Sequence, residues 1–288
     1  MKELYYQHSQ LEPEYVTKKL KNFLNEDKTG QDLTTHYSLL GKNKIVKAHI
    51  VCEEPIIFVG TTIISNIFNN DKIKVLKKEG AACKNGEIIA IIEAPAEMLL
   101  SKERVLLNLL QRLSGIATLT NKYIQTLNQT SIKILDTRKT TPGIRLFEKY
   151  AVNIGGGHNH RLDLEEGVMF KDNHLTIIRN LNESIKLFKA DYPGKKIQIE
   201  VDTPNQLRGI LKDIETPIDA VLLDNMSSDE VIECSVILRN SLANCFIEVS
   251  GGITLANILN YRNLDIDGIS IGAITHQAVS KNIKLEFQ

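Results

Sequence analysis

Residues 197–225 read IQIEVDTPNQLRGILKDIETPIDAVLLDN, and this stretch decides the fold class. Two short apolar runs, at residues 197–201 and 220–223, are separated by a more polar segment long enough for a helix. The first run ends in EVD and the second in LDN. The order of strand, helix and strand predicts two strands of a parallel sheet.

The same spacing recurs along the chain after Gly115. Further apolar runs that end in polar or glycine clusters occur at residues 132–135, 168–170, 246–249 and 268–271. Open doubly wound sheets and closed barrels share this alternation. Open sheets concentrate their chemistry at a switch point, whereas barrels place it at the carboxyl ends of successive strands. The repeated polar clusters therefore favour a parallel α/β barrel.

The first part of the chain has a mixed pattern. An amphipathic helix after Pro13 is predicted by the spacing of Val16, Leu20, Phe23 and Leu24. Alternation at residues 46–52 and apolar runs at 56–59 and 88–92 predict strands, and a second helix is predicted to begin near Ser101, with Arg104 on its polar face. We therefore expect an α+β domain at residues 1–115 and a barrel domain at residues 116–288.

The composition limits the classes of function. Lys plus Arg and Asp plus Glu both number 35, so no overall charge would draw the protein to nucleic acid or to an anionic membrane. No stretch approaches the ~18 consecutive apolar residues of a membrane span, and the amino terminus has no apolar signal region. The spacing of Cys52, Cys83, Cys234 and Cys245 matches neither a zinc site nor a disulfide scaffold. We expect a cytoplasmic protein with buried, reduced thiols.

One stretch concentrates positive charge in this otherwise balanced chain. Residues 136–174 read DTRKTTPGIRLFEKYAVNIGGGHNHRLDLEEGVMFKDNH. Guanidinium groups bind carboxylates and phosphates in a planar fork. Arg138 is followed by Lys139, and Arg161 is preceded by His160. The stretch therefore predicts a site for a small polyanion.

Lys171 extends this group of cations because it directly follows an apolar strand, where a long cation would point into the mouth of a barrel. A structural alternative is that the cations form salt bridges within the same stretch, with Asp136, Asp163, Glu165 or Asp172. Their position at strand ends favours ligand binding over packing.

Two carboxylates, Glu200 and Asp224, lie at the ends of predicted strands. Carboxylates in such positions bind Mg²⁺ or the hydroxyl groups of a ribose, since hard cations prefer oxygen ligands. Asp224 has a structural alternative as a cap on the following helix. The two roles are compatible.

Glycines follow the last two predicted strands. Ser250, Gly251 and Gly252 form an SGG sequence, and Gly272 is followed by His276. Exposed backbone amides before a helix amino terminus suit a terminal phosphate, although many glycine pairs merely turn the chain. The triple glycine at residues 155–157 lacks the spacing of a dinucleotide loop, so it predicts a bend that presents His160.

The charged stretch and these motifs resemble, in order, the blocks of the quinolinate phosphoribosyltransferase family, also called nicotinate-nucleotide pyrophosphorylase (carboxylating). The resemblance covers nearly the whole chain. Besides residues 136–174, the similar blocks are EDKTGQDLTT (26–35), ERVLLNLLQRLSGIATLT (103–120), IEVD (199–202), LLDNMS (222–227), EVSGGI (248–253) and ISIGAITH (269–276).

The resemblance implies an incomplete parallel α/β barrel with an amino-terminal α+β sandwich. It also implies an activity in de novo NAD biosynthesis, the transfer of a phosphoribosyl group to quinolinate with decarboxylation. The products would be nicotinate mononucleotide, pyrophosphate and CO₂. The implied quinolinate ligands are Arg138, His160, Arg161 and Lys171, joined by Arg104 from the neighbouring subunit of a homodimer.

For phosphoribosyl pyrophosphate, the resemblance implies ligands at Lys139, Ser250, Gly251, Gly252, Gly272 and His276. It implies Mg²⁺ at Glu200 and Asp224, and it makes Lys139, Glu200 and Asp224 the catalytic residues.

Other functions stay open at this point. Glu93 stands where the family pattern has glycine, which leaves room for a molybdenum-operon paralogue or a nicotinate phosphoribosyltransferase of the same fold. A barrel lysine, Lys139 or Lys171, could also form a Schiff base in an aldolase. A non-enzymatic phosphate-binding barrel would need only the SGG sequence and the cations.

Overall fold

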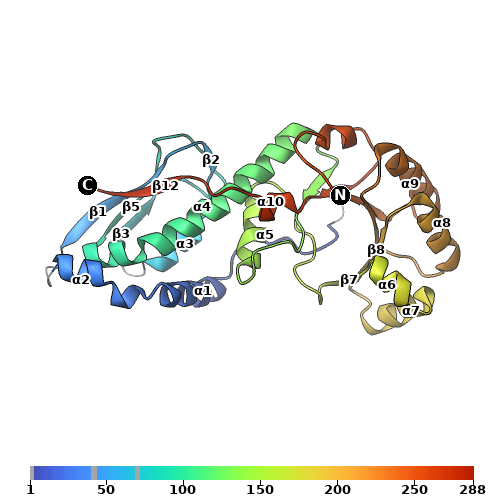
Figure 1. Cartoon of the computed structure of the whole chain (residues 1–288), viewed down its shortest axis with the longest axis horizontal. Helices are drawn as coiled ribbons and strands as arrows, with labels where there is room; N and C mark the ends of the chain where they lie inside the picture. Colours follow the sequence, from blue (N-terminus) through green and yellow to red (C-terminus); the bar gives the residue numbers. More distant parts are fainter. Residues whose placement is uncertain (1–2, 40–43, 69–71) are drawn as a thin grey trace. The chain divides into compact units, whose positions relative to one another are not determined.

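The computed structural model describes residues 3–39, 44–68 and 72–288 and divides the chain into two compact units (Figure 1). The barrel unit contains the amino-terminal segment that ends at Gln7, together with Lys122–Lys149 and Gly157–His276. The second unit contains His8–Asn121, Tyr150–Gly156 and Gln277–Gln288. The expected boundary at residue 115 stays a prediction.

The barrel unit is built on six parallel strands. They are β6 (Lys133–Leu135), β7 (Gly167–Phe170), β8 (Lys196–Val201), β9 (Ala220–Asp224), β10 (Phe246–Ser250) and β11 (Gly268–Ser270). Their order is β6-β11-β10-β9-β8-β7, so β6 and β7 form the two edges. The prediction of an incomplete parallel α/β barrel is confirmed.

Helices follow the strands, as the alternating pattern predicts (Figure 1). They are α6 (Asp172–Ile177), α7 (Leu181–Asp191), α8 (Pro204–Asp213), α9 (Ser228–Ser241), the 3₁₀ helix η2 (Ile258–Tyr261) and α10 (Ala273–His276). Side chains of Asn180, Thr203 and Ser227 cap α7, α8 and α9 by accepting a hydrogen bond from a backbone amide of the first turn.

The two faces of the barrel sheet differ in character. One face is apolar and buried, with Ile199, Leu223, Ile247 and Ile269 among its members. On the other face the strand register aligns Glu200 with Leu222, and Leu222 with Glu248. Buried polar side chains in these strands include Gln198, Glu248 and Ser270. Buried polar groups need partners, so this polar face marks the part of the sheet that carries chemistry.

The second unit contains an antiparallel sheet of four strands in the order β12-β1-β5-β3. Its strands are β1 (Ile45–Cys52), β3 (Lys72–Val75), β5 (Ile88–Pro95) and β12 (Ile283–Phe287). A separate pair joins β2 (Ile56–Ile57) to β4 (Ala82–Cys83). The last strand of the chain thus pairs with the first.

The other helices are α1 (Pro13–Glu26), η1 (Thr29–Gln31), α2 (Leu33–Leu39), α3 (Thr61–Ile67), α4 (Ala96–Leu127) and α5 (Arg145–Ile154). The predicted first helix is confirmed as α1, which buries Val16 and Leu20. The predicted start of the next helix near Ser101 is wrong, because α4 begins at Ala96. Residues 96–100, AEMLL, are strong helix formers that directly follow the strand, so they extend the helix backwards.

All four cysteines are free and buried, as the sequence predicts. Within the described residues, no helix has the length and apolar character needed to cross a membrane.

Candidate active site at the carboxyl ends of the barrel strands

The carboxyl ends of the barrel strands surround a cavity of about 300 Å³. Lys171 directly follows β7, Glu200 lies near the end of β8, and Asp224 and Ser250 are the last residues of β9 and β10. The cavity is lined by Thr137, Arg138, Lys139, His160, Arg161, Met169, Lys171, Glu200, Leu222, Asp224, Glu248, Ser250 and Ser270. The structure therefore brings eight of the predicted site residues together, namely Arg138, Lys139, His160, Arg161, Lys171, Glu200, Asp224 and Ser250.

The cations of this cavity do not form the salt bridges that the structural alternative required. In the described ranges, no recorded ion pair joins Arg138, His160, Arg161 or Lys171 to Asp136, Asp163, Glu165 or Asp172. Among the described residues, no recorded hydrogen bond or ion pair involves the side chain of Arg138 or of Lys139, whose hydrogen bonds use the backbone. Their charged groups are therefore available to a ligand.

Arg161 is a mostly buried residue of the cavity lining. Its side chain is only 6% exposed, and Nη1 donates a hydrogen bond to the carbonyl oxygen of Gly167 at 2.8 Å. Burial lowers the pKa of Arg161, and the nearby charge of Arg138 lowers it further. Two guanidinium groups that repel one another in a partly buried site would be stabilised by an anion between them.

A buried polar network supports the segment that carries His160. Asp136, directly after β6, accepts hydrogen bonds from Lys149, from the Asn159 amide at 2.7 Å and from the backbone amide of His160 at 2.8 Å. Lys149 also donates to the carbonyl oxygen of His160 at 2.7 Å. Burial raises the pKa of Asp136 and lowers the pKa of Lys149, and their mutual contact opposes both shifts. Asp136 and Lys149 thus fix the backbone of His160, although burying both charges is unfavourable.

Lys171 and Glu200 form an ion pair, with 2.7 Å between Nζ and Oε2. The family resemblance implies different ligands for these two residues, a carboxylate for Lys171 and a metal or ribose for Glu200. In the structure each satisfies the charge of the other. Two substrates, one with an acid group and one with a ribose, would replace this pair with two separate contacts.

Asp224 is not the cap of the following helix, because Ser227 and Glu230 form a reciprocal capping box at the start of α9. The carboxylate of Asp224 instead accepts a hydrogen bond from the Asn225 side chain at 2.7 Å. Burial raises the pKa of Asp202, and the charges of Asp224 and Asp172 raise it further. A cation near these carboxylates would relieve that repulsion.

The carboxylates of the cavity are of the kind that bind Mg²⁺. In the part of the chain that the structure describes, no group of three or more His, Cys, Asp or Glu side chains could hold a metal by itself. Glu200 and Asp224 nevertheless line one cavity on neighbouring strands. Mg²⁺ commonly uses one or two carboxylates and takes its other ligands from water and substrate phosphates.

The SGG sequence forms a bend with unused backbone donors. Gly251 and Gly252 have φ angles of +93° and +60°, which favour glycine. Among the described residues, neither glycine amide donates a recorded hydrogen bond. A Cβ on Gly251 would lie 2.2 Å from Oδ1 of Asn225, so no larger residue fits there. These amides suit an anionic oxygen.

The expected helix amino terminus directly after SGG is wrong. The next helical element is the short 3₁₀ helix η2, which begins only at Ile258, because the hydrogen bond from the Thr254 amide to Asn257 turns the chain first. Gly272 directly precedes the four-residue helix α10. A Cβ on Gly272 would lie 2.9 Å from Cδ of Lys139 and 3.2 Å from Nε2 of His276, so Gly272 brings these two side chains together.

Arg104 lies on α4 in the second unit, and its side chain is exposed. Its role in the site stays a prediction.

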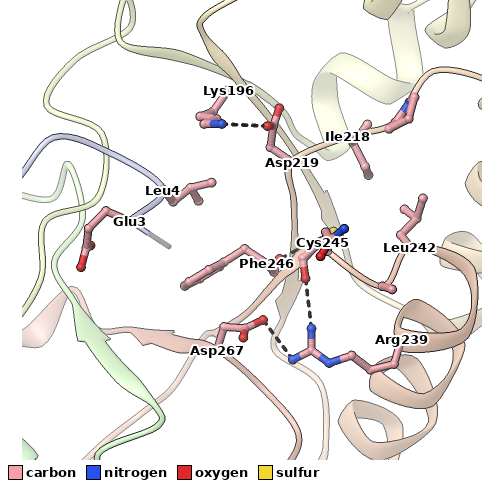
Figure 2. Close-up of a pocket in the computed structure, with 13 residues that line it drawn as sticks. Glu3, Leu4, Lys196, Ile218, Asp219, Arg239, Leu242, Cys245, Phe246 and Asp267 are labelled. Atoms are coloured by element: carbon pink, nitrogen blue, oxygen red, sulfur yellow. Dashed lines mark hydrogen bonds and ion pairs between the residues drawn. The ribbon is translucent and has the colours of Figure 1, made fainter. Parts of the chain in front are cut away.

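A larger cavity of about 700 Å³ lies at the opposite, amino-terminal ends of the strands (Figure 2). Its charged side chains are already paired. Lys196 binds Asp219 at 3.1 Å, and Arg239 binds Asp267 at 3.0 Å and the carbonyl oxygen of Cys245 at 3.1 Å. In barrels this end serves stability, whereas the carboxyl ends carry the chemistry. The smaller cavity is therefore the candidate active site.

The chain is similar to known proteins over most of its length. The family model described as quinolinate phosphoribosyl transferase, C-terminal domain, matches residues 116–286, and the corresponding N-terminal domain model matches residues 32–114. A Bacillus subtilis protein named "Probable nicotinate-nucleotide pyrophosphorylase [carboxylating]" is 40% identical over 276 residues, which cover 94% of this chain and 93% of that protein. A Mycobacterium leprae nicotinate-nucleotide pyrophosphorylase [carboxylating] is 34% identical over 93% of this chain and 95% of its own. The solved structure of the nicotinate-nucleotide pyrophosphorylase from Francisella tularensis superposes with a TM-score of 0.87, with 29% identity over 99% of this chain and all of that one.

Proposed function

This chain belongs to the quinolinate phosphoribosyltransferase family, and from that premise we propose that it transfers the phosphoribosyl group of phosphoribosyl pyrophosphate to quinolinate with loss of CO₂. The products are nicotinate mononucleotide and pyrophosphate, and the reaction belongs to NAD biosynthesis. One observation carries the proposal. A single cavity is lined by the guanidinium groups of Arg138 and Arg161, by His160 and by the carboxylates Glu200 and Asp224.

The cations suit a dicarboxylic acid. The fork of Arg161 and the unpaired guanidinium of Arg138 provide two sites for carboxylate oxygens, and His160 lies beside them. Holding quinolinate by both carboxylates would fix the direction of its ring nitrogen toward the ribose. Lys139 lies beside Gly272 and His276, where it would stabilise pyrophosphate as that group leaves.

Glu200 and Asp224 would hold the Mg²⁺ that the family resemblance implies, and the ion would supply charge neutralisation at the pyrophosphate. In the structure Lys171 forms an ion pair with Glu200. We propose that the ammonium group of Lys171 moves to a quinolinate carboxylate when substrates bind, which frees Glu200 for the ribose or the metal.

Decarboxylation needs no nucleophile from the protein. Once the ring nitrogen is bonded to the ribose, its positive charge stabilises the electron pair that the departing CO₂ leaves on the adjacent ring carbon, and a proton from water then takes the place of the carboxylate. The protein has only to orient the quinolinate ring and its carboxylates and to keep water from attacking the ribose.

The aldolase alternative fits the site poorly. A Schiff-base lysine must be a neutral amine in an apolar pocket. The ion pair of Lys171 with Glu200 suits an ammonium group, and the side chain of Lys139 is exposed. Treatment with borohydride and a keto substrate should therefore leave no covalent adduct on either lysine.

The proposed function is tested by comparing two acids. With phosphoribosyl pyrophosphate and Mg²⁺, quinolinate should be converted with release of CO₂, measured by trapping the labelled gas. Nicotinate has one carboxylate, so it would leave a buried cation unpaired, and its kcat/KM should be lower by roughly tenfold or more. Comparable rates on both acids, or activity with nicotinate alone, would assign the chain to nicotinate salvage instead. A chain that turns over neither acid would be the silent phosphate-binding protein.

We also propose a homodimer in which Arg104 completes the site of the neighbouring subunit. Arg104→Ala and Lys139→Ala chains should each be inactive, because each lacks one cation of every site. After mixing and subunit exchange, about a quarter of the sites should be intact, since half of the dimers are mixed and each mixed dimer has one complete site. Mass spectrometry of differently labelled subunits would verify the exchange. If activity stays absent in verified mixed dimers, Arg104 does not act across the interface.

A further inference from the structure

The amino-terminal segment Glu3–Gln7 belongs to the barrel unit, although it is the part of the described chain that comes first in the sequence. It lies outside both matched family models, which cover residues 32–114 and 116–286. Figure 2 shows Glu3 and Leu4 lining the larger cavity, at the amino-terminal ends of the strands. From there the segment reaches the loop of residues 157–166, which we call the His160 loop.

Hydrogen bonds join the segment to both ends of the His160 loop. Gln7 forms a two-way pair with the backbone of Asn159, in which the Asn159 amide donates to Oε1 at 2.8 Å and Nε2 donates to the Asn159 carbonyl at 3.2 Å. The backbone amide of Tyr6 donates to Oε1 of Glu166 at 2.9 Å, and the other oxygen of Glu166 accepts from the backbone amide of Leu162. The segment thus clamps the residues on either side of His160 and Arg161.

The carboxylate of Glu3 anchors the start of the segment. It accepts a hydrogen bond from the buried ammonium of Lys133 at 2.8 Å and lies 3.4 Å from Nδ1 of His158. Lys133 belongs to β6, and His158 opens the His160 loop. The segment is therefore attached to a strand of the sheet as well as to the loop.

Tyr5 contacts His160 itself. The Tyr5 side chain is only 5% exposed, and its ring lies 4.7 Å from the His160 ring between centroids, at an interplanar angle of 31°. The Tyr5 hydroxyl donates to Oε1 of Gln198 at 3.0 Å, and Nε2 of Gln198 donates to Oε2 of Glu248 at 2.7 Å. That same oxygen of Glu248 lies 3.5 Å from Nε2 of His160. Tyr5 therefore reaches His160 by two routes, directly through its ring and indirectly through two side chains.

The hydroxyl of Tyr5 determines which end of the Gln198 amide faces Glu248. A hydroxyl that donates to Oε1 turns the NH₂ group toward the carboxylate, which is the favourable orientation. Without that donor the amide could rotate and present its oxygen to the carboxylate, which repels it. Burial raises the pKa of Tyr5, and the charge of Glu248 raises it further, so the hydroxyl keeps its proton as a donor.

We propose that Glu3–Gln7 is a strap that positions the acid-binding side chains, and that Tyr5 within it is the positioning residue for His160. The inference rests on the proposed function for its substrate, because His160 and Arg161 are the groups that would bind the quinolinate carboxylates. Tyr5 is absent from the cavity lining and acts through His160 and Glu248, which do line it. The segment therefore helps to hold the acid-binding side chains in position.

The test uses the full chain with three substitutions. Tyr5→Leu removes the ring and the hydroxyl, and Tyr5→Phe removes the hydroxyl alone. Tyr37→Leu is the control, because the Tyr37 side chain is 69% exposed and lies on α2 in the second unit. Hydrogen exchange of the amides of residues 158–162, measured by mass spectrometry without substrates, reports the strap independently of activity. Steady-state kinetics then give KM separately for quinolinate and for phosphoribosyl pyrophosphate.

Tyr5→Leu should speed exchange in residues 158–162 on the order of tenfold and raise KM for quinolinate roughly ten- to thirtyfold, because it removes an aromatic contact and a hydrogen bond. KM for phosphoribosyl pyrophosphate should change less than about twofold, and Tyr5→Phe should recover part of the loss. Tyr37→Leu should match the wild type. Unchanged hydrogen exchange of residues 158–162 in Tyr5→Leu would contradict the proposal that the segment positions His160. An equal rise of both KM values would contradict it as well. Faster exchange in a chain that does not turn over quinolinate would support the strap and reject the proposed function.

Discussion

Replacing Arg161 by alanine should lower kcat/KM for quinolinate by roughly 100- to 1,000-fold, because a charge-assisted fork in a partly buried site is lost. The loss should fall mainly on KM for quinolinate. Arg161→Lys keeps the charge but not the planar fork, so it should recover only part of the activity. Steady-state kinetics with each substrate varied in turn would measure both effects.

Stability must be separated from binding in this experiment, since Arg161 also donates to the Gly167 carbonyl. Arg239→Ala is a suitable control. Arg239 likewise donates to a backbone carbonyl, that of Cys245, but it lies at the amino-terminal ends of the strands. It should lower the melting temperature without changing KM for quinolinate. If Arg161→Ala melts far below Arg239→Ala and binds quinolinate normally at low temperature, Arg161 is a structural residue.

Replacing Lys149 by methionine should lower the free energy of unfolding by about 3–5 kcal/mol, because it leaves the fully buried carboxylate of Asp136 without its cation. The double substitution Lys149→Met with Asp136→Asn should be more stable than the single one, since the neutral amide still accepts hydrogen bonds from the loop. Urea denaturation of the wild type, the single variant and the double variant would measure the differences in the free energy of unfolding.

The effect of Lys149→Met should depend on pH in a defined direction. Burial already raises the pKa of Asp136 in the native chain, and loss of Lys149 would raise it further. A carboxyl group with a raised folded-state pKa destabilises the fold above its unfolded-state pKa of about 3.9, where the unfolded chain releases the proton more readily. The loss of unfolding free energy in Lys149→Met, relative to the wild type, should therefore become smaller as the pH falls toward about 4. A deficit that stays constant with pH would show that packing, rather than the buried charge, determines it.

The sequence predicts the barrel well because each strand is a short apolar run that ends in polar residues. Arg138, Lys171, Glu200 and Asp224 were predicted for this reason, since the carboxyl ends of parallel strands meet at one edge. The choice between a cap and a ligand at Asp224 needed the structure, because only the capping box of Ser227 removes the first role.

The sequence motifs did not predict the residues that act from inside strands or from distant segments. Gln198 and Glu248 lie within apolar runs, where their alternation with isoleucine and valine is the only signal that they face the cavity. Tyr5 has no local signal at all. It stands in a polar segment far along the sequence from His160 and Gln198, and only the three-dimensional fold brings these side chains together.

The pairing of β12 with β1 has a consequence for synthesis on the ribosome. The edge of β1 is made early, but its partner β12 follows the last barrel strand and is made much later. Until then residues 45–52 expose an unpaired row of backbone donors and acceptors along one edge, while β5 and β3 can already pair on the other side. Nascent chains should therefore need protection from strand-to-strand association until β12 is made, and removing residues 283–287 would leave that edge unpaired.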